Sequence, residues 1–351
     1  MNKIFRIVAG IIIILVVTVL YIAFAPATKF SNSSKYLYVR DNVSAREQIM
    51  HQLDTGHIIR STSMFNFLAN QAKAWEKITP GRFEIKKGES IFSIVRMLRN
   101  NHQSAVRLVI NKLRLREDLA KIIGKNFSTD SVTTLNFLSN NDSLSSLGVD
   151  TNTIMTLIIP DTYFLNWNTS PKKILLRLKD EQEKFWGRND RLQKAAALNL
   201  SQNQVYTLAS IVEEETNMND EKGNIASVYM NRLTDNMKLA ADPTIKYALK
   251  DFSLKRIYTG YLAVQSPYNT YMYKGLPPGP ICTPQAITID AVLNAPKTDY
   301  LFFVAKSDFS GYHQFTSNFA DHEKYAKLYQ QALDTLIARK LQDSLNKTTQ
   351  P

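Results

Sequence analysis

VYTLASIVEEET, residues 205–216, is the stretch of the sequence that says most about the fold and the chemistry of this chain. At about 100° per residue its apolar side chains fall on one face, which predicts an amphipathic helix packed against a core. That face consists of Val205, Leu208, Ala209, Ile211 and Val212.

The three consecutive glutamates at the end of this stretch point in different directions. On the wheel Glu214 is opposite the apolar face, Glu213 lies more than about 90° from its centre, and Glu215 lies within about 50° of it. A carboxyl on an apolar face loses hydration, which raises its pKa and keeps it protonated as a general acid. From position alone the alternative stays open that Glu215 pairs with Lys or Arg at a helix end. We expect Glu214 to face solvent.

Two stretches downstream place polar residues on a constrained backbone. Asp242 precedes Pro243, which holds it extended, either as a helix cap or as a second active-site carboxylate. YNTY (268–271) leads into GLPPGPI (275–281), where two glycines and three prolines predict a stiff loop. Aromatic and amide groups on a rigid loop suit sugar binding, which favours a functional loop over an ordinary connector.

The N-terminal segment predicts a membrane anchor. Residues 7–24, IVAGIIIILVVTVLYIAF, carry no charge, and as a helix they span about 27 Å, close to the hydrocarbon thickness. Lys3 and Arg6 precede the segment, which predicts a cytoplasmic N-terminus. The alternative is a cleaved signal peptide ending at 23–25, but Pro26 follows that point directly. We therefore expect an uncleaved, single-pass anchor.

Other stretches predict regular elements outside the central helix. FEIKKGESIFSIVRMLR, residues 83–99, reads as a strand followed by a helix capped by Ser90, and it resembles the LysM motif of glycan-binding domains; the alternative is any strand–helix unit. Further expected strands are 36–39, 300–305 and 312–316, the last two as a hairpin, and further expected helices are one from Ser44, 171–199, 204–217, 221–235, one from Thr283-Pro284 to about Ala295, and 321–345.

Composition limits the possible classes of protein. The 351 residues have room for about two domains, and 44% apolar residues exclude a disordered chain. The single cysteine, Cys282, excludes an internal disulfide, and the five scattered histidines show no metal-ligand spacing, so we expect no metal and no cofactor. The net charge of +12 is spread out without a nucleic-acid-binding motif, which predicts no nucleic-acid partner.

Several motifs in order resemble the endolytic murein transglycosylase MltG (YceG-like) family over about residues 105–330. They are PDTY (160–163), LASIVEEET (208–216), ASVYMNRL (226–233), DPT (242–244), YNTY (268–271) and GLPPGPI (275–281). The resemblance implies an enzyme of the bacterial inner membrane that cleaves peptidoglycan strands internally, between N-acetylmuramic acid and N-acetylglucosamine, and leaves 1,6-anhydro ends. It also implies that the enzyme terminates nascent strands near peptidoglycan synthases.

The resemblance assigns the catalytic acid to Glu215, the last acid of the family's S-I-V-E-x-E-T motif. Where relatives often have Glu-Lys-Glu, this chain has three glutamates. The residues expected to bind substrate are Asp242, Thr244, Asn269, Thr270 and Tyr271. Further candidates are Asn231 and Arg232, which would orient Glu215 or bind an acidic stem peptide, with a surface position as the alternative for Arg232. The roles of Glu213 and His313 stay open.

The sequence thus predicts an α+β protein with a single N-terminal transmembrane helix, a small LysM-like αβ domain and a mixed α/β catalytic domain. The expected divisions are 1–6 cytoplasmic, 7–25 anchor, 36–104 LysM-like, 105–340 catalytic and 341–351 polar tail. Two alternatives to a transglycosylase remain. One is a hydrolase that pairs Glu215 with Asp242 or Glu213, and the other is a non-catalytic peptidoglycan-binding scaffold.

Overall fold

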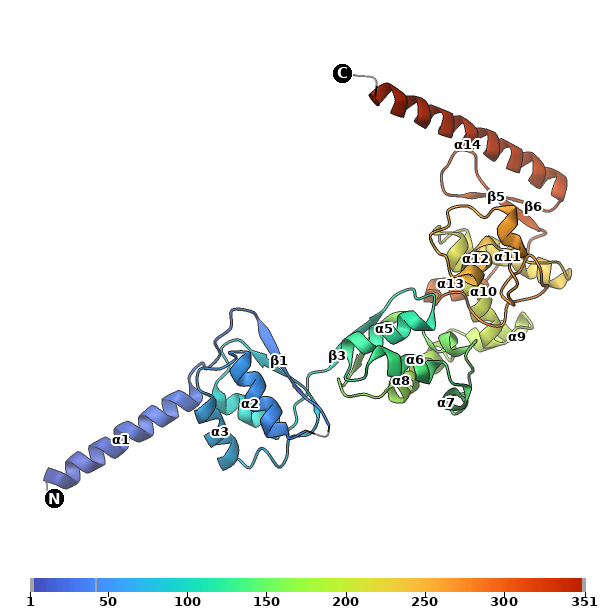
Figure 1. The fold of residues 1–351 in the computed structure, drawn as a ribbon. Coiled ribbons are helices and arrows are strands. Elements are labelled where there is room, and N and C mark those ends of the chain that lie inside the picture. The colour runs from blue at the N-terminus through green and yellow to red at the C-terminus, as the bar shows by residue number, and fades with distance from the viewer. Residues whose placement is uncertain (1–2, 42, 349–351) are drawn as a thin grey trace. The chain divides into compact units, whose positions relative to one another are not determined.

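The computed structural model describes residues 3–41 and 43–348, which form two compact units (Figure 1). Unit 1 contains the chain up to Leu108 together with Ile123–Ser131 and Thr162–Pro171, and unit 2 contains the remainder. The chain returns to unit 1 at Thr162–Pro171, where the Trp167 ring lies 4.9 Å from that of Tyr38. The domain division expected at 104/105 stays a prediction.

Helix α1, Lys3–Phe24, is the predicted membrane segment. Its stretch Phe5–Phe24 has a mean hydropathy of 3.1, and only 6% of the most apolar window is buried against the rest of the protein. The apolar side chains therefore face outward along the helix. By length and composition α1 can cross a membrane, which is compatible with the expected anchor.

A two-stranded sheet flanked by three helices makes up the folded part of unit 1. Strand β1 (Ser34–Val39) pairs antiparallel with β2 (Gly81–Lys86), so that Val39 lies opposite Gly81. The helices are α2 (Ala45–Thr55), α3 (Thr62–Gln71) and α4 (Ile91–Arg99). Ser90 caps α4 by accepting a 3.2 Å hydrogen bond from the backbone of Ser93, as predicted. The strand–helix unit is confirmed, and its LysM character stays a prediction.

Unit 2 is mainly helical. Its elements and those that link it to unit 1 are β3 (Val106–Ile110), α5 (Arg116–Asn126), α6 (Ser131–Leu138), α7 (Asn141–Ser145), the 3₁₀ helix η1 (Ile154–Leu157), β4 (Asp161–Leu165), α8 (Pro171–Trp186), α9 (Arg191–Ala197), α10 (Gln202–Glu215), α11 (Lys222–Thr234), α12 (Asp242–Leu249), the 3₁₀ helix η2 (Thr259–Ala263), α13 (Ala286–Leu293), β5 (Phe302–Ala305), β6 (His313–Thr316) and α14 (Phe319–Thr348). Strand β3 pairs with β4, and β5 with β6. The last pair is the predicted hairpin, with Phe302 opposite Thr316.

Helix α10 is the central element of unit 2, with α9, α11, α12 and α13 packed around it (Figure 1). A capping box between Ser201 and Gln204 begins the helix. Every residue from Val205 to Glu213 is buried, including the polar Thr207 and Ser210. The expectation of a single apolar face is therefore wrong, because neighbouring helices cover α10 on several sides.

Two expected helix boundaries also differ from the structure. The stretch 171–199 is split into α8 and α9 because Asn189 and Asp190 adopt positive φ angles of 59° and 55°, which a continuing helix cannot accommodate. Thr283 does not cap α13; Gln285 takes that position, while the Thr283 hydroxyl accepts a 2.9 Å hydrogen bond from the backbone of Leu113.

The C-terminal helix is longer than expected. Helix α14 ends at Thr348, so that residues 341–348 of the expected polar tail are helical, whereas 349–351 lie outside the described residues. Its first turns pack on β5 and β6. The start of α14 thereby reaches the site described next.

Candidate active site

The C-terminal end of α10 opens into a pocket of about 450 Å³ in unit 2. The start of α12, the middle of α11, strand β5 and the first turn of α14 complete its walls. The lining residues are Glu215, Tyr229, Arg232, Leu239, Ala240, Asp242, Tyr271, Phe302, Phe303, Phe319 and His322. Glu215, Asp242 and Tyr271, which the sequence singles out from separate motifs, are therefore brought together.

Glu215 is the last residue of α10, and its carboxyl is held by a buried tyrosine on α11. The Tyr229 hydroxyl donates a hydrogen bond of 2.5 Å to Oε1 of Glu215. Burial raises the pKa of Glu215 to about 7, and the negative charge of Asp242 acts in the same direction. The hydrogen bond from Tyr229 and the positive charges of Lys246 and Arg232 oppose this rise in pKa. The carboxyl is therefore able to hold a proton near neutral pH.

Arg232 supplies a positive charge to the same pocket without an ion pair to Glu215. Its Nε donates to the carbonyl of Leu301 at 2.7 Å, and its Nη1 donates to that of Leu239 at 2.6 Å. The guanidinium lies 5.2 Å from the centre of the Phe302 ring. These contacts fix the guanidinium against backbone, so that its effect on Glu215 is electrostatic rather than a direct hydrogen bond.

Asp242 and Tyr271 form a second hydrogen-bonded pair in the pocket. The Tyr271 hydroxyl donates to Oδ1 of Asp242 at 2.5 Å. Asp242 is the first residue of α12, and Ala241 holds the cap position, so of the two alternatives for Asp242 the helix cap is excluded. Asp242 is an exposed residue that lines the pocket, and its carboxylate is accessible to a substrate.

Three expected sugar contacts, Asn269, Thr244 and Thr270, are buried and hydrogen-bonded within the protein. Asn269 is buried; its Nδ2 donates to the carbonyls of Leu262 and Val264 at 2.9 Å, and its Oδ1 accepts from the backbone of Tyr271 at 3.0 Å. With its amide fully engaged, Asn269 orders the loop that presents Tyr271. Direct sugar binding by Asn269 stays a prediction.

Thr244 and Thr270 are likewise engaged within the protein, and their sugar binding also stays a prediction. Both are buried, and their hydroxyls are hydrogen-bonded to each other at 2.8 Å. Oγ1 of Thr270 accepts from the backbone of Ala241 at 3.0 Å, and Oγ1 of Thr244 donates to the carbonyl of Ala241 at 2.7 Å. The two threonines join the start of α12 to the loop that carries Tyr271, and so hold Asp242 and Tyr271 within reach of each other.

The other two glutamates of the acidic run are engaged in ion pairs. Glu213 is buried and forms a 3.1 Å ion pair with Lys222, and Thr288 donates a hydrogen bond to the same oxygen of Glu213. Glu214 pairs with Lys112 at 3.0 Å and with Arg114 at 2.9 Å, and its side chain is only 13% exposed. The expectation that Glu214 faces solvent is wrong, because two cations in the segment between β3 and α5 pair with it.

Asn231 and His313 also have structural partners. The Asn231 amide donates to the carbonyls of Thr298 and Tyr300, each at 2.9 Å. His313 donates through its backbone to Glu221 at 2.7 Å, and its Nδ1 lies 3.1 Å from the second oxygen of that carboxylate. Both residues fix the hairpin against α11 and do not line the pocket.

Sequence reasoning did not single out Tyr229 or His322. Tyr229 had a usable signal, since its hydroxyl interrupts the otherwise apolar face of the 221–235 helix. His322 on α14 had none, since it becomes part of the pocket only through tertiary packing. Its ring stacks on Phe302 at 5.3 Å, and burial lowers its pKa. Its Nδ1 is buried without a hydrogen-bond partner among the described residues.

The comparisons with known proteins agree on one family. The model of the YceG-like family matches residues 37–328. A protein of Bacillus subtilis strain 168 named endolytic murein transglycosylase is 40% identical over 130 residues, which covers 37% of this chain and 35% of that protein. One of Streptococcus pneumoniae R6 with the same name is 31% identical over 173 residues, covering 48% of this chain and 30% of that protein. The matched segment thus spans about a third of the length of these curated relatives.

A solved structure shows the same fold. The crystal structure of a yceG-like protein from Listeria monocytogenes covers 84% of this chain and 99% of that one, with a TM-score of 0.55 and 24% sequence identity. At this level of identity the likeness concerns the fold alone. It supports the mixed α+β architecture described above.

Proposed function

This chain belongs to the YceG-like family, and from that premise we propose that it is an endolytic murein transglycosylase. The curated relatives carry that name, although the match covers only part of their length. The observation that carries the proposal is the Glu215 carboxyl, whose pKa burial raises to about 7 at the base of the pocket. A general acid of that pKa matches the reaction expected of such an enzyme.

The proposed reaction uses one carboxyl twice. Protonated Glu215 gives its proton to the glycosidic oxygen as the bond from C1 of the N-acetylmuramic residue breaks. The C6 hydroxyl of the same sugar then attacks C1, and the Glu215 carboxylate takes the hydroxyl proton, which yields a 1,6-anhydro ring and restores the acid. Because the nucleophile belongs to the substrate, the entropic cost of positioning a water molecule is avoided.

Between the two proton transfers Glu215 is a charged carboxylate, and its surroundings act on this state in both directions. The hydrogen bond from Tyr229 and the charge of Arg232 both favour the carboxylate, whereas burial and Asp242 favour the neutral acid. This balance keeps the free energies of the two protonation states of Glu215 close near neutral pH. The aromatic rings of Phe302 and Phe303 offer an apolar surface against which a sugar face can pack.

The second candidate function is a hydrolase that uses two carboxyls. One observation favours it: Asp242 lines the same pocket as Glu215. Glycosidases of this type place their carboxyls about 5 Å or about 6.5–9.5 Å apart. Glu213 is not a partner in such a mechanism, since Lys222 and Thr288 enclose its carboxylate.

In the deciding experiment purified sacculi are incubated with the full chain, and the molecular masses of the released muropeptides are measured. The transglycosylase predicts products one water lighter than the hydrolysed ones, and E215Q should lower their rate of release by about 10²–10⁴-fold. Reducing muramic ends alone would favour the hydrolase. Release by E215Q equal to that of the wild type would reject Glu215 as the acid, and no release by the wild type would favour a non-catalytic scaffold.

Location and partners complete the proposal. The exposed apolar surface of α1 supports a single-pass anchor in the inner membrane, and Lys3 and Arg6 favour a cytoplasmic N-terminus with the catalytic domain outside. In this arrangement the enzyme acts on nascent strands near peptidoglycan synthases and ends their polymerisation, while the LysM-like unit holds the glycan. Digestion of unit 2 by a protease added on the periplasmic side, and not by one added on the cytoplasmic side, would support this topology.

A further inference from the structure

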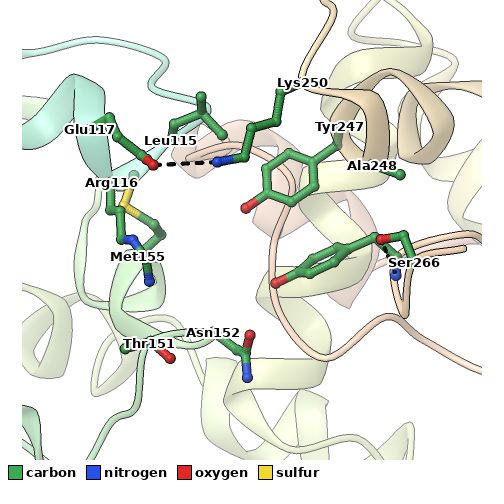
Figure 2. A pocket seen from close by; sticks show the side chains of 11 residues that line it. Leu115, Arg116, Glu117, Thr151, Asn152, Met155, Tyr247, Ala248, Lys250 and Ser266 are labelled. Atoms are coloured by element: carbon green, nitrogen blue, oxygen red, sulfur yellow. Dashed lines mark hydrogen bonds and ion pairs between the residues drawn. The ribbon is translucent and has the colours of Figure 1, made fainter. Parts of the chain in front are cut away.

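A second pocket, of about 200 Å³, lies elsewhere in unit 2 (Figure 2). We call it the tyrosine pocket. Its polar lining includes Arg116 on α5, Thr151 and Asn152 before η1, and two tyrosines, Tyr247 on α12 and Tyr268 in the following loop. The two tyrosine rings pack with their centres 4.6 Å apart. The mechanism proposed above makes no use of any of these residues.

The tyrosine pocket and the active-site pocket share two structural elements. Helix α12 carries Asp242 in the active-site pocket and Tyr247 in the tyrosine pocket. Those positions are five residues apart, or about 7.5 Å along the helix axis. The loop after α12 likewise carries Tyr271 in the first pocket and Tyr268 in the second. A short branch of a polymer bound in the active-site pocket could therefore reach the tyrosine pocket.

Arg116 is the cation of this pocket that forms no ion pair with a carboxylate of the described residues. Figure 2 shows Arg116 extending toward Thr151 and Asn152 on one side, with the Tyr247 hydroxyl directed at the same space from the other. The adjacent Glu117 is taken by Lys250, in an ion pair of 3.4 Å drawn across the pocket in Figure 2. In the described part of the chain Arg116 itself belongs to no ion pair.

The other nearby carboxylate, Asp150, is also satisfied. It accepts from the backbone of Asn152 at 3.0 Å, and from the backbone and hydroxyl of Thr153 at 2.8 and 2.7 Å. The charge of Arg116 does reach the tyrosines, since it opposes the rise that burial causes in the pKa of Tyr247. The pocket therefore joins a free guanidinium to phenol, amide and hydroxyl groups.

We propose that the tyrosine pocket binds a carboxylate of the peptide branch carried by the glycan strand, with Arg116 as the partner of that carboxylate. The planar guanidinium presents paired N–H donors that match the two oxygens of a carboxylate. Tyr247, Tyr268 and Asn152 are suited to the amide groups of the peptide that carries it. This inference rests on the proposed function, since it assumes a peptidoglycan substrate. It assigns the branch to one end of α12 and the cleaved bond to the other.

The test measures binding to the full chain in detergent, in an E215Q background so that nothing is cleaved. The probes are a disaccharide tetrapeptide with free carboxylates, the same compound with its carboxylates amidated, and uncharged chitotetraose. Arg116→Gln should weaken binding of the first probe by about 10–100-fold, the range of a charge-assisted hydrogen bond, and leave the other two unchanged. Lys121→Gln, the same loss of charge at an exposed position of α5, should change none of them.

Several outcomes overturn the proposal. Equal affinity of the Arg116→Gln and Lys121→Gln variants for the free-carboxylate probe is one, and no binding of that probe to the parent is another. An equal loss of chitotetraose binding would mean that the pocket recognises sugar. Arg116→Lys keeps the positive charge but loses the paired N–H donors of the guanidinium, and it should give an intermediate affinity. Melting temperatures confirm that each variant is folded.

An activity measurement separates this inference from the proposed function. In the otherwise wild-type chain, Arg116→Gln should raise KM on peptide-bearing strands by the same factor, with kcat unchanged, and should have no effect on strands stripped of peptide. Failure of the wild type to cleave any strand would overturn the proposed function, while the binding comparison would still decide the role of Arg116. An unchanged KM on peptide-bearing strands would contradict the inference alone.

Discussion

The Tyr229 hydroxyl donates a 2.5 Å hydrogen bond to Oε1 of Glu215 and so ties the middle of α11 to the last residue of α10. Tyr229 is itself buried, and burial raises its pKa well above the ordinary value, so it remains a donor across the working pH range. The carboxyl is thereby fixed in one orientation at the base of the pocket. A proton donor that must act on one glycosidic oxygen requires this kind of positioning.

The first prediction concerns the pH dependence of the wild-type reaction. Glu215 must be protonated to act as the acid, and its pKa is raised to about 7. The rate should therefore be level below that pH and fall about tenfold per pH unit above it. Initial rates of anhydro-muropeptide release from pH 5 to 9 test this. A decline that begins near the ordinary glutamate value of 4.5 would contradict the assignment.

Tyr229→Phe should move that decline to higher pH. The lost hydrogen bond favours the charged carboxylate, so its removal raises the pKa of Glu215 further. It also removes stabilisation of the carboxylate formed during proton transfer, which should lower the rate by about 10–100-fold. The matched change Tyr312→Phe, outside the pocket, should leave both the rate and the pH of its decline unaltered. A decline that stays in place in Tyr229→Phe would show that the tyrosine does not act on the acid.

Asp242→Asn distinguishes the two enzymatic mechanisms. The negative charge of Asp242 raises the pKa of Glu215, so its neutralisation should shift the decline in rate to lower pH while the anhydro product persists. A two-carboxyl hydrolase would instead lose at least about 10²-fold in rate at every pH. Product mass and a pH series of the variant supply the measurement, with Asp235→Asn, at an exposed position after α11, as the control.

Stability should reveal the cost of keeping Glu215 buried. Its pKa is raised in the folded chain from 4.5 to about 7, so folding favours the protonated form. The stability present below pH 4.5 is therefore lost as pH rises to about 7. Relative to E215Q, which cannot ionise, the wild type should lose up to about 3 kcal/mol of unfolding free energy over this interval. Chemical denaturation at pH 4.5 and 8 measures this loss, with Glu183→Gln on the exposed side of α8 as the control variant.

Lys222→Met should destabilise the fold through Glu213. The ion pair of 3.1 Å between them is almost fully buried, so removing the cation leaves a buried carboxylate without its partner. The expected loss is about 3–5 kcal/mol of unfolding free energy. Lys184→Met breaks the exposed pair with Glu181 and should cost about 0–1 kcal/mol. Similar losses for the two variants would show that the buried pair stabilises the fold no more than an exposed one does.

The sequence by itself determined the elements that depend on local pattern. The uncharged run 7–24, the cap at Ser90 and the two strands of the final hairpin are properties of neighbouring residues, and each appears in the structure where the sequence places it. The motif order also identified Glu215 as the candidate acid. Helical periodicity placed that residue toward the core because a helix wheel depends only on residue spacing.

Only the tertiary structure decided what surrounds each side chain. The wheel placed Glu214 in solvent, yet Lys112 and Arg114, some hundred residues earlier, cover it. The YNTY stretch predicts sugar contacts, and in the structure the polar side-chain atoms of Asn269 and Thr270 form hydrogen bonds with the backbone of adjacent segments. Tyr229 and His322 reach the pocket from α11 and α14. A pKa, a hydrogen-bond partner or a pocket wall depends on groups distant along the chain, and those distances are set when the helices pack.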